Sequence, residues 1–125
     1  MRRRASPEAT IQRAVFQHLQ QRGVPGVFAF HPANGGYRKP KEAAIFKGLG
    51  VVAGVPDVIA IKDGRVFGLE LKADGGSRTT SQVNTHSALR AAGATVATAK
   101  GLDAAIAQLE SWGLLRGAAN LLART

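Results

Sequence analysis

The sequence has no cysteine, one tryptophan, one tyrosine, and only 8 acidic residues against 17 basic ones. Without cysteine the protein cannot form disulfides or thiolate zinc sites, which fits an intracellular chain. The scarcity of aromatic residues gives little support for recognition of unpaired bases by stacking. No apolar run is long enough to span a bilayer, so we expect no insertion into a membrane. What remains is a soluble, basic protein.

Positive charge is what the chain has in excess. The formal net charge is +9 and the pI is near 11.2, which predicts a polyanionic partner, nucleic acid first and an anionic membrane surface second. With 125 residues we expect a single domain over 1–125, with a basic tail at 1–5 and an apolar tail at 113–125. The arginines of the basic tail resemble a signal-peptide start, but no apolar segment follows them.

The strongest local signal is Asp63-Gly64, which stands between two apolar runs. This dipeptide favours a two-residue β-hairpin loop, because both positions tolerate a positive φ. Such a loop pairs Lys62 with Arg65 and thereby sets the register of both strands.

Counting back in this register places Asp57 directly opposite Glu70, with Cβ atoms roughly 4.5–5.5 Å apart. Two opposed carboxylates repel each other, and a divalent cation between them reverses the sign of that interaction. Lys72 projects from the same face, where Val66 and Gly68 leave room, so we expect an acid, an acid and a lysine on one open surface. The opposite face resembles a core, with Phe67, Leu69 and Leu71.

These residues carry a resemblance to a known family. Pro56-Asp57 and the later Glu70-Leu71-Lys72 resemble the PD-(D/E)xK nuclease motif. Together with the sequence HPANGG at 31–36, the Gly54 that begins GVPD, and Gln82, they resemble the VRR-NUC branch of these nucleases. The resemblance extends from about residue 8 to about residue 112 and is to small stand-alone proteins of phages and prophages. It implies a cytoplasmic protein of a bacterial or phage-infected cell.

The resemblance implies a restriction-endonuclease-like core, a central mixed β-sheet with helices on both faces. It also implies that Asp57 and Glu70 bind Mg²⁺ or Mn²⁺ together with the backbone carbonyl of Leu71. Lys72 would orient or deprotonate the attacking water and offset charge on the phosphorane. Gln82 would position that water or a phosphate oxygen.

The first helix is predicted to begin at Ser6 and Pro7, by an N-cap and a proline at N1, and to end near Gln21. Glu8 lies on the centre line of its apolar stripe. This acid either complements the helix dipole or points into the site, and periodicity leaves both open. The resemblance favours Glu8 as a direct or water-mediated metal ligand.

The other predicted elements follow from turn and cap signals. They are a strand at 27–31, a helix at 40–47, a helix from Thr79 or Thr80 to 92, a strand at 94–99 and a helix at 103–112. We expect Ala43, Ala44, Ile45 and Phe46 to pack the second helix. The glycine-rich stretch at 48–54 lacks the strand–helix context of a dinucleotide site, so no small-molecule cofactor is expected. The apolar tail either packs on the core or contacts a partner subunit.

Several polar and basic residues are candidates for contact with DNA, although each is also compatible with a solvated turn or surface. They are Asn34, Gly35, Gly36, Arg38, Lys39, Lys41, Lys47, Arg78 and Arg90.

Three functions compete. The first is a metal-dependent DNA endonuclease acting on duplex or branched DNA, with a homodimer and Holliday-junction cleavage suggested by the resemblance. The second is a catalytically inactive nucleic-acid-binding module with a nuclease fold, against which the intact Asp57, Glu70 and Lys72 argue. The third is a structural or assembly protein whose charge serves solubility or RNA association. Fold alone does not separate them.

Overall fold

The computed structural model describes residues 6–33 and 39–117. Its helices and strands follow the predicted order and differ from the predicted bounds by only a few residues. In chain order they are α1 (Pro7–Arg22), β1 (Phe28–Phe30), α2 (Pro40–Gly48), β2 (Val58–Lys62), β3 (Arg65–Lys72), α3 (Thr80–Ala91), β4 (Thr95–Lys100) and α4 (Leu102–Ser111). None of these helices is long and apolar enough to cross a bilayer.

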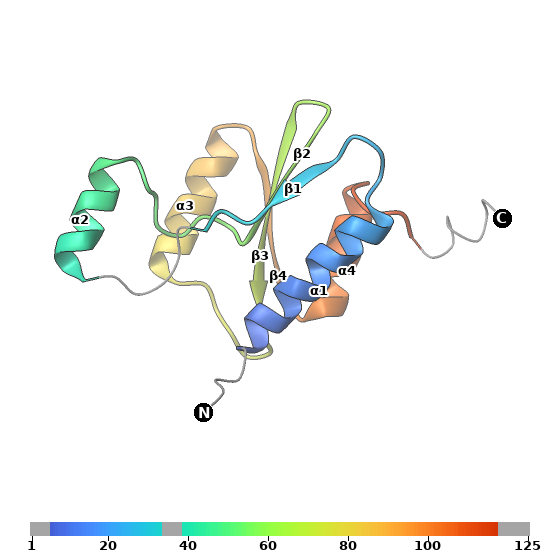
Figure 1. The fold of residues 1–125 in the computed structure, drawn as a ribbon, viewed down its shortest axis with the longest axis horizontal. Coiled ribbons are helices and arrows are strands. Elements are labelled where there is room, and N and C mark those ends of the chain that lie inside the picture. The colour runs from blue at the N-terminus through green and yellow to red at the C-terminus, as the bar shows by residue number, and fades with distance from the viewer. Residues whose placement is uncertain (1–5, 34–38, 118–125) are drawn as a thin grey trace.

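A four-stranded sheet in the order β1-β2-β3-β4 forms the centre of the fold (Figure 1). Strands β1, β2 and β3 pair in antiparallel fashion, whereas β4 runs parallel to β3 after a crossover through α3. Helices α1 and α4 cover one face of the sheet, and α3 covers the other. The predicted fold class, a mixed sheet with helices on both faces, is therefore confirmed.

The hairpin of β2 and β3 has the predicted register. Lys62 pairs with Arg65, and the ladder continues as far as Val58 opposite Leu69. Both loop residues have positive φ, 52° at Asp63 and 75° at Gly64, as a type I′ turn requires. Asp57 immediately precedes Val58, and Glu70 immediately follows its partner Leu69, so the same register places Asp57 opposite Glu70.

The core lies between the sheet and the helices α1 and α4. Val15 and Leu19 of α1 are buried against the sheet, as the apolar stripe predicted, and α1 begins where Ser6 Oγ accepts a hydrogen bond from the Ala9 amide at 3.0 Å. From the sheet and α4 the core receives Val58, Ala60, Phe67, Leu69, Leu71, Ala99, Ala105 and Leu109. The predicted core face of β3 is thus confirmed.

The first residues of the apolar tail, which the structure describes as far as residue 117, belong to this core. Leu114 and Leu115 are buried, and Leu115 forms an isolated bridge with Gly23. Arg22 holds the segment in place: it donates a hydrogen bond to the Arg116 carbonyl and forms an ion pair with Glu110. Of the two alternatives for the tail, packing on the core applies to Leu114 and Leu115.

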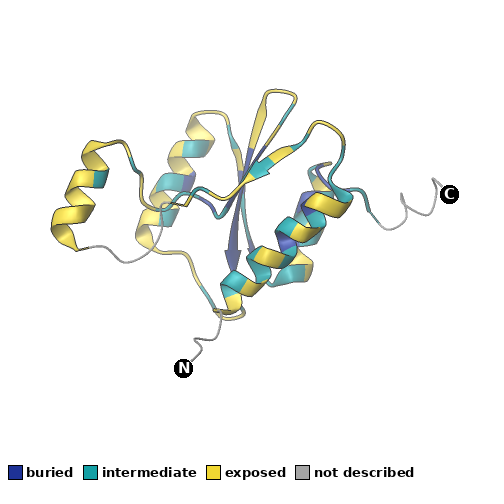
Figure 2. Ribbon diagram, viewed as in Figure 1, coloured by how far each residue is buried: buried dark blue, intermediate teal, exposed yellow. Residues whose placement is uncertain are grey.

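Helix α2 departs from the prediction. It has no buried residue, and Ile45 is 56% exposed while the following Leu49 is 74% exposed. In Figure 1 and Figure 2 the helix stands apart from the sheet, with α3 between them. The expectation that Ala43, Ala44 and Ile45 pack was wrong, because these residues are exposed and α3 already covers this face of the sheet. Phe46, which was expected to pack as well, is half-buried.

Candidate active site

The acid–acid–lysine motif converges where β2 and β3 end. Asp57 Oδ2 accepts a hydrogen bond from the Leu71 amide at 2.8 Å, so its side chain reaches across to β3. Lys72 Nζ lies 3.9 Å from Glu70 Oε2. Glu70 and Lys72 alternate with Leu69 and Leu71 along the strand, so they project from the face opposite the core.

The site is less open than expected. Only 2% of Glu70 and 6% of Lys72 is exposed. A Cβ at Gly68 would lie 2.9 Å from Pro56 Cγ, which shows that the proline fills the space that we expected to be free. Burial by Pro56 and α3 therefore replaces the expected open surface, and it strengthens each electrostatic interaction within the site.

Gln82 joins the site from the first turn of α3. Its Nε2 donates to Glu70 Oε2 at 3.2 Å, and its Oε1 accepts from the Thr79 amide at 2.9 Å. The Gln82 amide in turn donates to Thr79 Oγ1 at 3.2 Å, which completes a capping box. Both polar atoms of the Gln82 side chain therefore have a partner: Oε1 bonds to the start of α3, and Nε2 bonds to Glu70.

His86 is a site residue to which the sequence analysis assigned no role. It is fully buried, and its Nε2 lies 3.5 Å from Glu70 Oε1. Neither of its ring nitrogens has a hydrogen-bond partner among the described residues. The signal in the sequence was its position four residues after Gln82, because such residues share one face of a helix.

The electrostatics of the site centre on Glu70. Its burial, followed by the hydrogen bond and the negative charge of Asp57, raises the pKa of Glu70 to about 9, against the opposing effect of Lys72. Burial lowers the pKa of His86, and the charges of Arg78 and Arg90 lower it further. Near neutral pH, Glu70 therefore holds a proton in the metal-free protein and His86 is neutral.

Glu8 lies next to the site by its proximity to Lys72. Its Oε1 lies 4.0 Å from Lys72 Nζ, so the first turn of α1 brings a carboxylate to the lysine. His31, to which the sequence assigned no chemistry, donates from Nδ1 to the Asp57 carbonyl at 2.7 Å and so anchors the backbone at that acid.

The segment before Asp57 is held against the start of α3. Thr85 Oγ1 donates to the Ala53 carbonyl at 2.5 Å. Gly54 has a φ of 83°, and a Cβ there would lie 2.3 Å from the Ser81 carbonyl oxygen. Only glycine accommodates both the positive φ and this close approach. Gly54 thereby sets the distance between the Asp57 segment and the helix that carries Gln82 and His86.

The donor atoms at this point suit a hard divalent cation. Within residues 6–33 and 39–117, no three His, Cys, Asp or Glu side chains form a ready-made metal cluster. The candidates are the carboxyl groups of Asp57 and Glu70 and the Leu71 carbonyl, which faces the Asp57 side because N–H and C=O of one strand residue point the same way. Burial and the neighbouring Asp57 raise the pKa of Glu70, and a bound cation would offset both effects by favouring the ionised carboxylate.

The candidate DNA-contacting residues fall into three groups. Asn34, Gly35, Gly36 and Arg38 lie outside the described residues. Lys39, Lys41 and Lys47 are exposed on or just before α2, apart from the site. Arg78 and Arg90 line a pocket between α3 and β4, and their charges act on His86.

Solved structures of VRR_NUC domains resemble this chain. One, described as "VRR_NUC domain protein", has a TM-score of 0.66 and 25% sequence identity, over 88% of this chain and 90% of that one. Another, described as "VRR_NUC domain", has a TM-score of 0.60 and 17% identity, over 86% of this chain and 99% of that one. No protein-family model matches the sequence, and no curated protein matches it either.

Proposed function

Because the chain folds as a VRR-NUC-type nuclease domain, we propose that it is a divalent-metal-dependent endonuclease that hydrolyses phosphodiester bonds in DNA. One observation carries the proposal: Asp57, Glu70 and Lys72 meet on the face of the sheet opposite the core, where Glu70 and Lys72 are buried and Asp57 is half-buried. A fold that required only stability would not bury the carboxyl group of Glu70 next to a second carboxyl group.

Asp57, Glu70 and the Leu71 carbonyl would hold Mg²⁺ or Mn²⁺. When bound, the ion would polarise the phosphoryl group and lower the pKa of a water molecule. Glu8 Oε1 lies 4.0 Å from Lys72 Nζ, so this carboxylate would add negative charge near the ion and would assist through water.

Lys72 is the residue we assign to the attacking water. Its ammonium lies 3.9 Å from Glu70 Oε2 and 4.0 Å from Glu8 Oε1, where it would orient a nucleophile and offset charge on the phosphorane. Gln82 acts on this arrangement by fixing Glu70 Oε2. We therefore propose that Gln82 positions the metal-binding carboxylate and influences the water through it.

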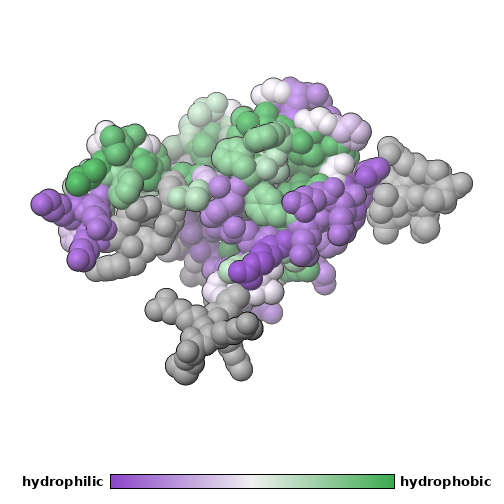
Figure 3. Space-filling model, viewed as in Figure 1, coloured by the Kyte–Doolittle hydropathy of each residue, from purple (hydrophilic) through white to green (hydrophobic). Residues whose placement is uncertain are grey.

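We propose that the protein acts as a homodimer on duplex or branched DNA. Support comes from an uncovered apolar row in which Phe28, Ile61 and Val66 stand side by side across β1, β2 and β3. Phe28 is 66% exposed, and Figure 3 shows hydrophobic surface over the sheet and over α2. Monomeric proteins rarely leave such contiguous apolar surface exposed. Light scattering on wild type and on Phe28→Asp tests the assignment, and a monomeric wild type would refute it.

A cleavage assay tests the activity. Purified protein is incubated with plasmid, linear duplex and four-way-junction DNA in Mg²⁺, in Mn²⁺ and in EDTA. We expect cleavage only with a divalent ion, and a loss of about 100-fold or more in Lys72→Met. Thermal unfolding of the variant controls for its fold. Binding without cleavage under every condition would support the alternative, an inactive nucleic-acid-binding module with a nuclease fold.

A further inference from the structure

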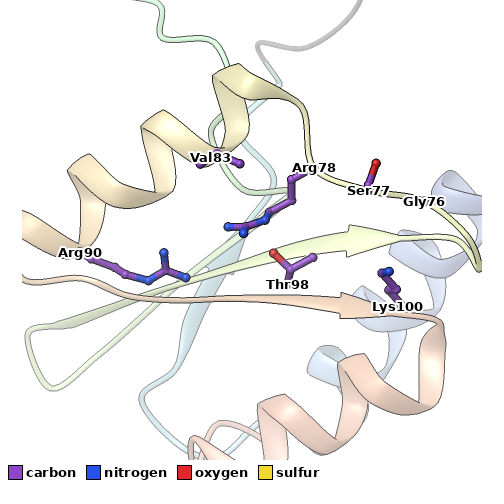
Figure 4. Close-up of a pocket in the computed structure, with 7 residues that line it drawn as sticks. All are labelled: Gly76, Ser77, Arg78, Val83, Arg90, Thr98 and Lys100. Carbon is purple, nitrogen blue, oxygen red and sulfur yellow. The ribbon is translucent and has the colours of Figure 1, made fainter.

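A basic pocket lies beside the candidate active site, on the same face of the sheet. It has a volume of about 620 Å³ and is bounded by α3, β4 and the segment that precedes α3. Arg78, Arg90 and Lys100 bring positive charge to it, and Ser77 and Thr98 bring hydroxyl groups (Figure 4). No carboxylate of the described residues lines it.

The three cations are available for an anionic ligand. None of them forms an ion pair with a carboxylate in the described parts of the chain. Arg90 is also partly pre-positioned, because its Nη2 donates to the Val96 carbonyl at 3.0 Å. Figure 4 shows the guanidinium groups of Arg78 and Arg90 directed into the space between α3 and the sheet. Uncompensated cations in a recess favour an anion that can accept several hydrogen bonds.

Thr98 provides a second, independent observation. Its Oγ1 is buried and has no hydrogen-bond partner among the described residues. A buried hydroxyl usually finds a partner, so an unsatisfied one that lines a basic pocket suggests that a ligand oxygen completes it. In Figure 4 this hydroxyl points from β4 toward Arg78.

The pocket stands in a defined relation to the catalytic residues. In the parallel pairing of β3 and β4, Thr98 is opposite Glu70 and Lys100 is opposite Lys72. Aligned residues of neighbouring strands share a face and are separated by about 4.8 Å. The pocket is therefore about one strand spacing from the acid and the lysine, so a nucleic-acid strand bound at these residues also passes the pocket. The charges of Arg78 and Arg90 also act on His86, which touches Glu70.

We propose that this pocket binds a phosphate group of the cleaved strand that neighbours the scissile phosphate. The inference rests on the proposed nuclease function and extends it, because it assigns Lys100, Thr98 and Ser77 to the substrate site. Arginine forks match the oxygens of a phosphate, and the Thr98 hydroxyl donates to one of them. The backbone of the strand, independent of base sequence, is thus the feature that is recognised.

The test uses an oligonucleotide duplex whose cleavage position has been mapped with wild type. A neutral methylphosphonate replaces the phosphate on the 5′ or the 3′ side of that position. We expect one of the two substitutions to lower kcat/KM by about ten-fold or more. Arg78→Gln and Lys100→Gln should lower kcat/KM on the unmodified duplex by a similar factor and be insensitive to the methylphosphonate.

Arg65→Gln is the matched control, because it removes one positive charge roughly 23 Å along β3 from Lys72. Arg65 lies over the Phe67 ring, away from the pocket. This variant should retain the full sensitivity to the methylphosphonate. Equal losses in Arg65→Gln and Lys100→Gln, or no effect of either methylphosphonate, would overturn the proposal. Inhibition by inorganic phosphate without a methylphosphonate effect would overturn it as well, since the pocket would then bind a free anion.

Binding measurements separate this inference from the nuclease assignment. Fluorescence anisotropy of the same duplex in EDTA needs no catalysis. Arg78→Gln and Lys100→Gln should each reduce the slope of log K against log salt by about one, beyond the change in Arg65→Gln. If that reduction occurs but no condition gives cleavage, the nuclease function fails and the phosphate pocket stands. If cleavage occurs without that reduction, the pocket assignment fails alone.

Discussion

Gln82 Nε2 donates to Glu70 Oε2 at 3.2 Å while Gln82 Oε1 closes the capping box of α3. One side chain therefore links the start of a helix to the buried acid of the candidate site. A glutamate at this position would preserve the cap but would lose the donor and add a carboxylate beside Glu70. The amide is thus required by the site and not by the helix.

Gln82→Glu separates these two roles. We expect a loss of about 10-fold or more in cleavage rate and in Mn²⁺ affinity, because the orientation of Glu70 depends on the lost donor. Gln82→Ala should lose the cap as well and cost about 1 kcal/mol in the free energy of unfolding. Cleavage kinetics, calorimetric titration with Mn²⁺ and urea denaturation measure these effects. Full activity in Gln82→Glu would show that the hydrogen bond has no functional role.

The buried Glu70 predicts a dependence of stability on pH. Its pKa is raised from 4.5 to about 9, so above pH 4.5 the folded state holds a proton that the unfolded state has released. The free energy of unfolding of the metal-free protein should therefore fall as the pH rises toward 9, by up to about 1.4 kcal/mol per unit. The lowered pKa of His86 has the opposite effect: it makes the free energy of unfolding rise with pH, but only below the ordinary histidine pKa of 6.5.

Urea denaturation in EDTA between about pH 7 and pH 8.5 measures the Glu70 contribution with little interference from His86. Glu70→Gln cannot titrate and should flatten the curve. Equal slopes in wild type and in Glu70→Gln would contradict the raised pKa.

His86 should contribute to stability as a packed residue. It is fully buried between α3 and the sheet, so His86→Ala removes a ring and leaves a cavity. We expect a loss of about 2–4 kcal/mol in the free energy of unfolding. Asn84→Ala, at an exposed position of the same helix, should change it by less than about 0.5 kcal/mol. Comparable effects in the two variants would show that His86 is not packed as described.

A comparison of substitutions at Gly54 and Gly50 isolates the effect of the close approach between the Gly54 backbone and α3. Both have positive φ, 83° and 92°, but a Cβ at Gly50 meets nothing within 4 Å, whereas one at Gly54 meets the Ser81 carbonyl. Gly50→Ala should therefore cost only the backbone strain, about 1 kcal/mol, and Gly54→Ala at least about 2 kcal/mol more. Thermal and urea unfolding measure the difference. Equal costs would mean that the loop shifts to accommodate the methyl group.

Much of the site was predictable because its signals are local. Asp63 and Gly64 set a two-residue turn, and the turn alone sets which residues face each other, so the meeting of Asp57 with Glu70 followed from counting. Ser6 and Thr79 marked helix starts by their ability to accept from backbone amides. His86 went unassigned because its spacing from Gln82 indicates a helix face but does not say what that face covers.

By itself, the sequence determined the hairpin register, the helix starts, the alternation along β3 and the excess of positive charge, because each depends on neighbouring residues or on composition. Only the tertiary structure decided that Glu70 and Lys72 are buried, that His86 faces Glu70, that α2 stands apart from the core, and that Thr98 and Lys100 lie one strand from the acids. These features depend on which elements cover the sheet, and burial by residues distant in the chain is what changes the pKa of a carboxyl group or leaves a hydroxyl without a partner.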